Sequence, residues 1–103
     1  MTLHTRPGFY QDIAREQLRL LERAGPEVAE AWRLAVLATI EFLKTHPLVG
    51  RDRKDLKHPG VRSWRVKRFR RWLIFYGVRE DMLILHRVIY GTMDLPKATF
   101  ELP

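Results

Sequence analysis

One segment of the sequence, residues 82–90, carries apolar side chains at almost every position and limits the folds open to the chain. Its aliphatic, β-branched and aromatic residues are typical of a strand, in which successive side chains point to opposite faces. A strand that is apolar on both faces has to be covered on both faces. Regular alternation would place Ile84, His86, Val88 and Tyr90 on one face and Leu83, Leu85, Arg87 and Ile89 on the other.

The first half of the chain offers helices that can cover one of these faces. Apolar residues recur at helical spacing in residues 9–23 and again from about residue 26 to residue 45, and Gly25-Pro26 separates the two segments. Gly is typical of a helix C-terminus and Pro of the first turn of the next helix, so the sequence predicts an αα-hairpin. The expected buried stripes contain Tyr10, Ile13, Ala14, Leu18 and Leu21, then Val28, Trp32, Val36, Ile40 and Leu43.

The remaining segments read as strands and loops. Leu3–Thr5 is a candidate first strand, and residues 61–67, 72–78 and 82–90 are strand candidates after a loop at residues 48–59. The short connections between the last three predict an antiparallel meander. We therefore expect one α+β domain over residues 1–103, with an N-terminal strand and an αα-hairpin packed on a mainly antiparallel sheet of three to four strands.

The second face of this sheet needs a cover that the helices do not supply. The candidates are the loop at residues 48–59, the segment at residues 91–103, or a separate protein. We favour a separate protein, because large exposed apolar patches on small proteins usually mark interfaces.

Composition excludes several classes of protein. The chain of 103 residues has no cysteine, which excludes disulfides and cysteine-based metal sites and fits a reducing cytoplasm. The N-terminus lacks the apolar region of a signal peptide, and no apolar run approaches the roughly 20 residues of a membrane helix. We expect a cytoplasmic protein with no membrane partner.

Positive charge is concentrated in one segment. Residues 51–71 hold ten Lys or Arg against two Asp, whereas the rest of the chain holds nine against ten acidic residues. The net charge of +7 therefore arises within these residues. Such a field favours an acidic partner, either nucleic acid or an anionic protein surface. The alternative is an ordinary solvated strand edge, which Lys and Arg commonly protect.

The sequence gives little sign of a catalytic or cofactor site. We expect no cofactor and no metal, because there is no Gly-rich phosphate loop and the four histidines are scattered. Asp12, Glu16 and Glu22 look like a solvated helix face. A metal-independent ribonuclease stays open, since RNA cleavage needs only a base, an acid and cations. The candidate groups for it are Arg65, Lys67, Arg68 and Arg87 with Tyr76 or Tyr90.

The order of these segments resembles the toxins of the RelE/ParE superfamily from type II toxin–antitoxin modules. The matching stretches are RPGFYQDI (6–13), FLKTHPLVGRD (42–52), GVRSWRV (60–66), WLIFYGV (72–78) and LILHRVIYGTMDL (83–95). The resemblance implies a toxin that is neutralised by a cognate antitoxin, whose acidic and amphipathic C-terminal segment wraps it. The acidic residues of that segment would meet the Arg-rich strand.

The resemblance also separates two mechanisms. RelE-like members are ribosome-dependent mRNA endoribonucleases, and ParE-like members inhibit DNA gyrase by binding. Where the nuclease branch has two arginines and a C-terminal tyrosine, this chain has Leu73, Met93 and Thr99. Leucine and methionine cannot stabilise a phosphorane dianion. A binding-type, ParE-like toxin is therefore favoured over an enzyme, with a RelE-like nuclease and a member that only binds antitoxin as alternatives.

We assign no catalytic residue and expect partner or target binding at a basic surface. Strand alternation predicts that Arg65 and Lys67 point together, away from the helices, if Trp64 and Val66 face them. This pair is the sharpest expectation for the site. The full set is Arg62, Arg65, Lys67, Arg68, Arg70, Arg71 and Arg87.

Overall fold

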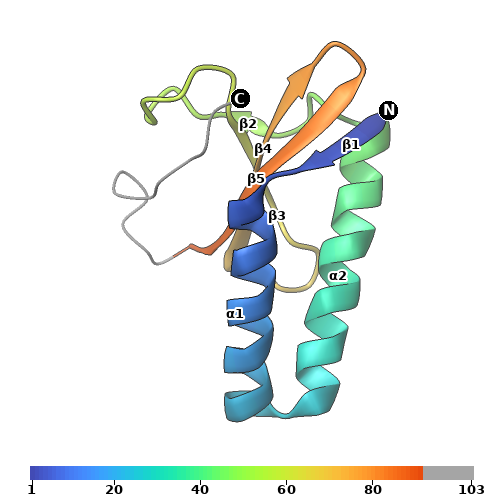
Figure 1. The fold of residues 1–103 in the computed structure, drawn as a ribbon, viewed down its shortest axis with the longest axis vertical. Coiled ribbons are helices and arrows are strands. Elements are labelled where there is room, and N and C mark those ends of the chain that lie inside the picture. The colour runs from blue at the N-terminus through green and yellow to red at the C-terminus, as the bar shows by residue number, and fades with distance from the viewer. Residues whose placement is uncertain (92–103) are drawn as a thin grey trace.

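The computed structural model describes residues 1–91 as two helices packed on a five-stranded sheet (Figure 1). The sheet order is β1-β5-β4-β3-β2, with β1 parallel to β5 and every other pair antiparallel. This confirms the α+β class, and a short extra strand, β2, raises the strand count above the expected three to four. The elements are β1 (Thr2–Thr5), α1 (Pro7–Ala24), α2 (Pro26–Thr45), β2 (Arg51–Asp52), β3 (Arg62–Arg65), β4 (Trp72–Arg79) and β5 (Met82–Tyr90).

The helical hairpin forms where the sequence predicts it. Pro7 and Pro26 each open a helix, and Gly25 joins the two helices with a φ of 95°, which favours glycine. The Gly25 N–H donates to the carbonyls of Leu20 and Leu21 and closes α1. In Figure 1 the two helices run side by side, and the turn that joins them extends beyond the sheet.

One face of the sheet and the helices enclose the main core. Trp32, Val36 and Leu43 of α2 are almost completely buried there, as expected from their spacing, and Phe9 of α1 joins them. Their partners from the second half of the chain are Val66, Ile74, Tyr76, Leu83, Leu85 and Val88.

The buried side of α1 differs from the prediction. Tyr10, Leu18 and Leu21 are exposed, whereas Asp12 and Glu16, expected on the solvated face, are 1% and 4% exposed. Asp12 and Glu16 face the sheet because Arg87 and Trp72 donate hydrogen bonds to them there. In Figure 1 the C-terminal end of α1 extends beyond the sheet, so the sheet does not cover the side chains of that end.

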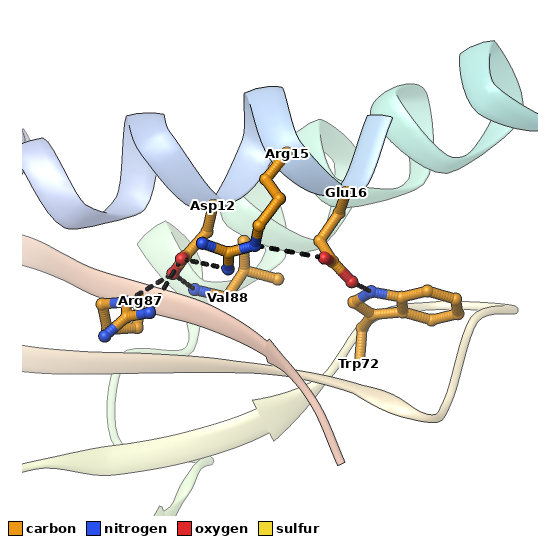
Figure 2. Close-up of polar contacts among 6 residues, drawn as sticks. All are labelled: Asp12, Arg15, Glu16, Trp72, Arg87 and Val88. Atoms are coloured by element: carbon orange, nitrogen blue, oxygen red, sulfur yellow. Dashed lines mark hydrogen bonds and ion pairs between the residues drawn. The ribbon is translucent and has the colours of Figure 1, made fainter. Parts of the chain in front are cut away.

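The carboxylate of Asp12 joins α1 to β5 (Figure 2). Arg87 donates to it from Nε at 2.6 Å and from Nη2 at 2.9 Å, and the Val88 N–H donates at 3.0 Å. Arg15 adds a further contact at 2.6 Å. One turn along α1, Glu16 accepts a hydrogen bond of 2.8 Å from the Trp72 indole. Buried carboxylates are tolerated when donors compensate them in this way.

A β-bulge lies in β5 beside this ion pair. Phe75 is opposite Arg87 and Tyr76 is opposite Leu85, so His86 has no residue opposite it on β4. The extra residue reverses the alternation of side chains after His86. The predicted faces of residues 82–90 are therefore wrong: Leu83, Leu85 and Val88 all face the helices, and Ile89 faces the other side.

The loop between β2 and β3 covers part of the second face of the sheet. Leu56 and Val61 from the loop pack with Phe75 and Ile89, and Leu73 borders the cluster. The chain itself therefore supplies part of the cover that we expected from a partner protein. The other candidate, residues 91–103, lies outside the described residues except for Gly91.

A buried tyrosine fixes the segment that follows α2. The Tyr76 hydroxyl donates to the Pro47 carbonyl at 2.9 Å and accepts from the Gly50 N–H at 2.8 Å. A Cβ on residue 50 would overlap this hydroxyl oxygen, so the close approach requires glycine. Burial raises the pKa of Tyr76, and the hydrogen bond from Gly50 offsets part of that rise.

Replacing Asp12 by Asn is expected to lower the free energy of unfolding by about 3–5 kcal/mol, because it removes the buried charged partner of the ion pair with Arg87. Urea unfolding of the purified protein measures this. The matched control is Glu30→Gln, which breaks the exposed helical pair with Arg33 and should change stability little. Equal effects of the two substitutions would contradict the role given to Asp12.

Replacing Tyr76 by Phe should cost about 1–3 kcal/mol, because the Gly50 N–H loses its acceptor. Because the pKa of Tyr76 is raised in the folded protein, its hydroxyl stabilises the fold at pH values below the usual tyrosine pKa of 10.0. This stabilisation is lost as the pH rises above that value. The stability difference between wild type and variant should therefore narrow above that pH. Tyr10→Phe, at an exposed position, is the control. A difference that stays constant with pH would contradict this account.

Candidate functional site

The excess positive charge lies at the β2–β3 side of the sheet, and most of it is not neutralised. Among residues 1–91, ion pairs at the helices engage Arg15, Arg33 and Lys44. Within residues 51–71 the described ion pair is Arg53–Asp55, in which the hydrogen bonds from Arg53 lower the pKa of Asp55 to about 2. The segment therefore keeps a large uncompensated charge.

These cations border a groove of about 730 Å³ between the second half of α2 and the edge of the sheet. We call it the basic groove. Six of its lining residues are cationic and none is acidic. Apolar lining comes from Ala38, Phe42, Val49, Trp64, Val66 and Leu73, and the cations are Arg51, Arg53, Arg65, Lys67, Arg68 and Arg70.

Two aromatic side chains from different elements meet in this groove. The rings of Phe42 in α2 and Trp64 in β3 lie 5.9 Å apart between centroids and only 20° from parallel. Phe42 is 38% exposed, and its ring also stacks with the imidazole of His46, with 4.4 Å between the ring centroids. The groove thus combines an accessible aromatic surface with a cationic rim.

Four of the seven predicted site residues come together here. Arg65, Lys67, Arg68 and Arg70 line the groove. Trp64 and Val66 pack against the core under the helices, and Arg65 is exposed as expected. β3 ends at Arg65, however, so Lys67 belongs to the turn toward β4, where Arg68 adopts a left-handed φ of 71°.

The other three predicted residues have contacts within the chain. Arg62 donates to the carbonyl oxygens of Leu48 and Gly50, at 3.3 and 2.8 Å, and holds the segment after α2. Arg71 donates to the Tyr90 hydroxyl at 3.2 Å, a hydrogen bond that raises the pKa of Arg71. Arg87 is the counterion of Asp12.

Sequence reasoning missed several residues of the groove. Phe42 lies outside the predicted buried stripe of α2, and the sequence does not separate it from Leu34 and Leu37, which are also off the stripe and exposed but do not line the groove. Arg53 is only 6% exposed and lies over the ring of Phe75 at 5.4 Å, while its guanidinium bonds Ser63 and Asp55. Nothing in the sequence distinguishes this arginine from its neighbours.

The groups proposed for RNA cleavage are mostly engaged elsewhere. Tyr76 is fully buried with both of its hydroxyl contacts inside the chain, and Arg87 is paired with Asp12. Leu73, at a position where the nuclease branch has an arginine, lines the groove. Met93 and Thr99 lie outside the described residues.

The described part of the chain offers neither a metal site nor a membrane-spanning helix. No cluster of three or more His, Asp or Glu in residues 1–91 is arranged to hold a metal ion. Neither helix of this part is long and apolar enough to cross a bilayer.

Comparisons with known proteins give one consistent result. The sequence model described as "ParE toxin of type II toxin-antitoxin system, parDE" matches residues 4–95. Toxin ParE3 of Caulobacter vibrioides is 31% identical over 93 residues, which cover 90% of this chain and 88% of that protein. A solved chromosomal ParDE toxin–antitoxin structure from P. aeruginosa has a TM-score of 0.74 at 18% identity, covering 87% of this chain and 95% of that one, and it supports the fold. From the family match and the Caulobacter relative, this chain belongs to the ParE toxins of type II toxin–antitoxin systems.

Proposed function

We propose that this chain is a cytoplasmic toxin that inhibits DNA gyrase by binding and is neutralised by a cognate antitoxin with an acidic, amphipathic segment. Its membership of the ParE family supports the role of a toxin. The observation that carries the binding mode is the basic groove, in which Arg65, Lys67, Arg68 and Arg70 form no ion pair with the described residues. Such a groove complements an acidic segment in charge.

The groove also complements an amphipathic segment in shape and polarity. Phe42, Val49 and Trp64 offer apolar contacts beside the cationic rim. An antitoxin segment that orders on binding pays a conformational entropy cost and needs both kinds of contact to bind tightly. Phe42 and the neighbouring Val49 are both more than a third exposed in the free chain, so their burial would contribute to that affinity.

A ribosome-dependent endoribonuclease remains the alternative function, but the contacts of its candidate groups favour it less. General acid–base groups have to reach the substrate. Tyr76 is enclosed beneath the segment after α2, and Arg87 is committed to α1. A nuclease would have to work with the cations of the groove and with Tyr90, whose hydroxyl already accepts from Arg71.

The target is tested with the purified toxin, freed from any co-expressed antitoxin, in gyrase supercoiling and DNA-cleavage assays. We expect loss of supercoiling or accumulation of cleaved DNA, and reversal when antitoxin is added first. A folded toxin that leaves gyrase unaffected but cuts mRNA on translating ribosomes would establish the alternative function. Mapping of mRNA 5′ ends in the same preparation distinguishes the two.

The antitoxin site is tested by charge substitution in the groove. The triple variant Arg65→Gln, Lys67→Gln, Arg70→Gln should weaken antitoxin binding by about tenfold or more and reduce its dependence on salt. The matched control, Arg23→Gln, Lys57→Gln, Arg79→Gln, removes the same charge from exposed positions outside the groove. Calorimetry or surface binding at two salt concentrations measures both. Equal losses would mean that net charge alone, and not the groove, determines affinity.

A further inference from the structure

We propose that the basic groove is a binding site for single-stranded nucleic acid, with phosphates at Arg65, Lys67 and Arg70 and a base on the aromatic surface of Phe42 and Trp64. The inference goes beyond the proposed function, because it requires neither gyrase nor an antitoxin. It rests on three features of the groove, namely its charge, its aromatic residues and the state of the adjacent sheet edge.

The charge of the groove suits a sugar–phosphate backbone. Apart from Arg53, which is paired with Asp55, four of its five cations are arginines, whose planar guanidinium groups bind phosphate oxygens in a two-pronged manner. Arg65 donates to the Arg70 carbonyl at 2.8 Å, and this contact places its guanidinium at the mouth of the turn between β3 and β4. A backbone with one negative charge per nucleotide would meet several of these cations in succession.

The aromatic residues suit a base. Proteins that bind single strands combine a cationic groove with aromatic rings on which the bases stack, and every base has a face that can do so. Phe42 and Trp64 lie in the same groove as the arginines, and a base would reach these rings where the exposed His46 imidazole now stacks on Phe42. Paired bases in a duplex present no free face to such rings, so the geometry points to a single strand.

The sheet edge beside the groove gives little opportunity for the other obvious occupant, a peptide that adds a strand. β2 is opposite only Arg62 and Ser63. The Lys67 N–H already donates to the Thr39 hydroxyl at 3.0 Å, and the Val66 N–H donates to the Trp72 carbonyl at 2.9 Å. On this edge of β3, Arg65 is almost the only residue whose main-chain groups are left to pair with an added strand. Strand addition relies on a row of main-chain hydrogen bonds. Recognition at this groove therefore depends on side chains.

The test is fluorescence anisotropy of a labelled oligothymidylate about fifteen nucleotides long, titrated with the full-length toxin freed from partners. Between roughly 50 and 200 mM salt, the triple variant Arg65→Gln, Lys67→Gln, Arg70→Gln should show a salt slope smaller by roughly 2, at about 0.7 per phosphate contact. The equal-charge control Arg23→Gln, Lys57→Gln, Arg79→Gln should keep the wild-type slope. Equal slopes for the two variants would overturn the proposal.

The aromatic contribution is tested at constant charge. Phe42→Leu should weaken oligothymidylate binding by at least about fivefold, whereas Tyr10→Leu, an exposed aromatic outside the groove, should leave it unchanged. Thermal unfolding checks that both variants are folded. If Phe42→Leu does not fold, the tryptophan fluorescence of the wild type is measured instead. Quenching by the oligonucleotide but not by oligoglutamate supports stacking on the rings, and the absence of quenching by the oligonucleotide contradicts it.

Two other results count against the proposal. In the first, oligoglutamate of the same length displaces the oligonucleotide at equal concentration, and Phe42→Leu has no effect on binding. The groove would then be a surface for acidic peptides only. In the second, duplex DNA binds as tightly as the single strand, which would show that stacking on Phe42 and Trp64 does not contribute to binding. Neither result would affect the gyrase assay, so the proposed function is judged separately.

Discussion

The ion pair between Asp12 and Arg87 connects the two halves of the chain, and much of the structure depends on it. Asp12 lies in the second turn of α1 and Arg87 at the bulge of β5, seventy-five residues apart in sequence. The same carboxylate accepts the Val88 N–H, so one side chain fixes both the rotation of α1 and the local path of β5. The bulge in turn decides which side chains of β5 enter the main core.

This arrangement also explains where the charge of the molecule is available. Acidic residues of the helices are used locally, either against the sheet, as Asp12 and Glu16 are, or in helical pairs such as Glu30–Arg33 and Glu41–Lys44. Few are left to neutralise the sheet edge. The cations of the groove therefore act on whatever approaches the protein, over a distance set by the salt concentration.

Local signals in the sequence predict much of the fold, and long-range contacts account for what they miss. Pro26 and the spacing of Trp32, Val36 and Leu43 predict α2 with its observed bounds, because capping and periodicity are local properties. The burial of Asp12 depends on Arg87, a partner that is distant in sequence. The groove was predicted in part, through Arg65 and its neighbours, but Phe42 joins it only because α2 passes over the edge of β3.

The parallel pairing of β1 with β5 places the first and last strands of the described chain side by side. Proteins are synthesised from the N-terminus, and contacts between distant segments form late. During translation the helical hairpin is made well before β4 and β5, so α1 has neither Trp72 nor Arg87 as a partner until those strands have been synthesised. A chain that lacks β5 would lose the pairing of β5 with both β1 and β4 and the ion pair to Asp12 together, and we expect it to be degraded by proteases.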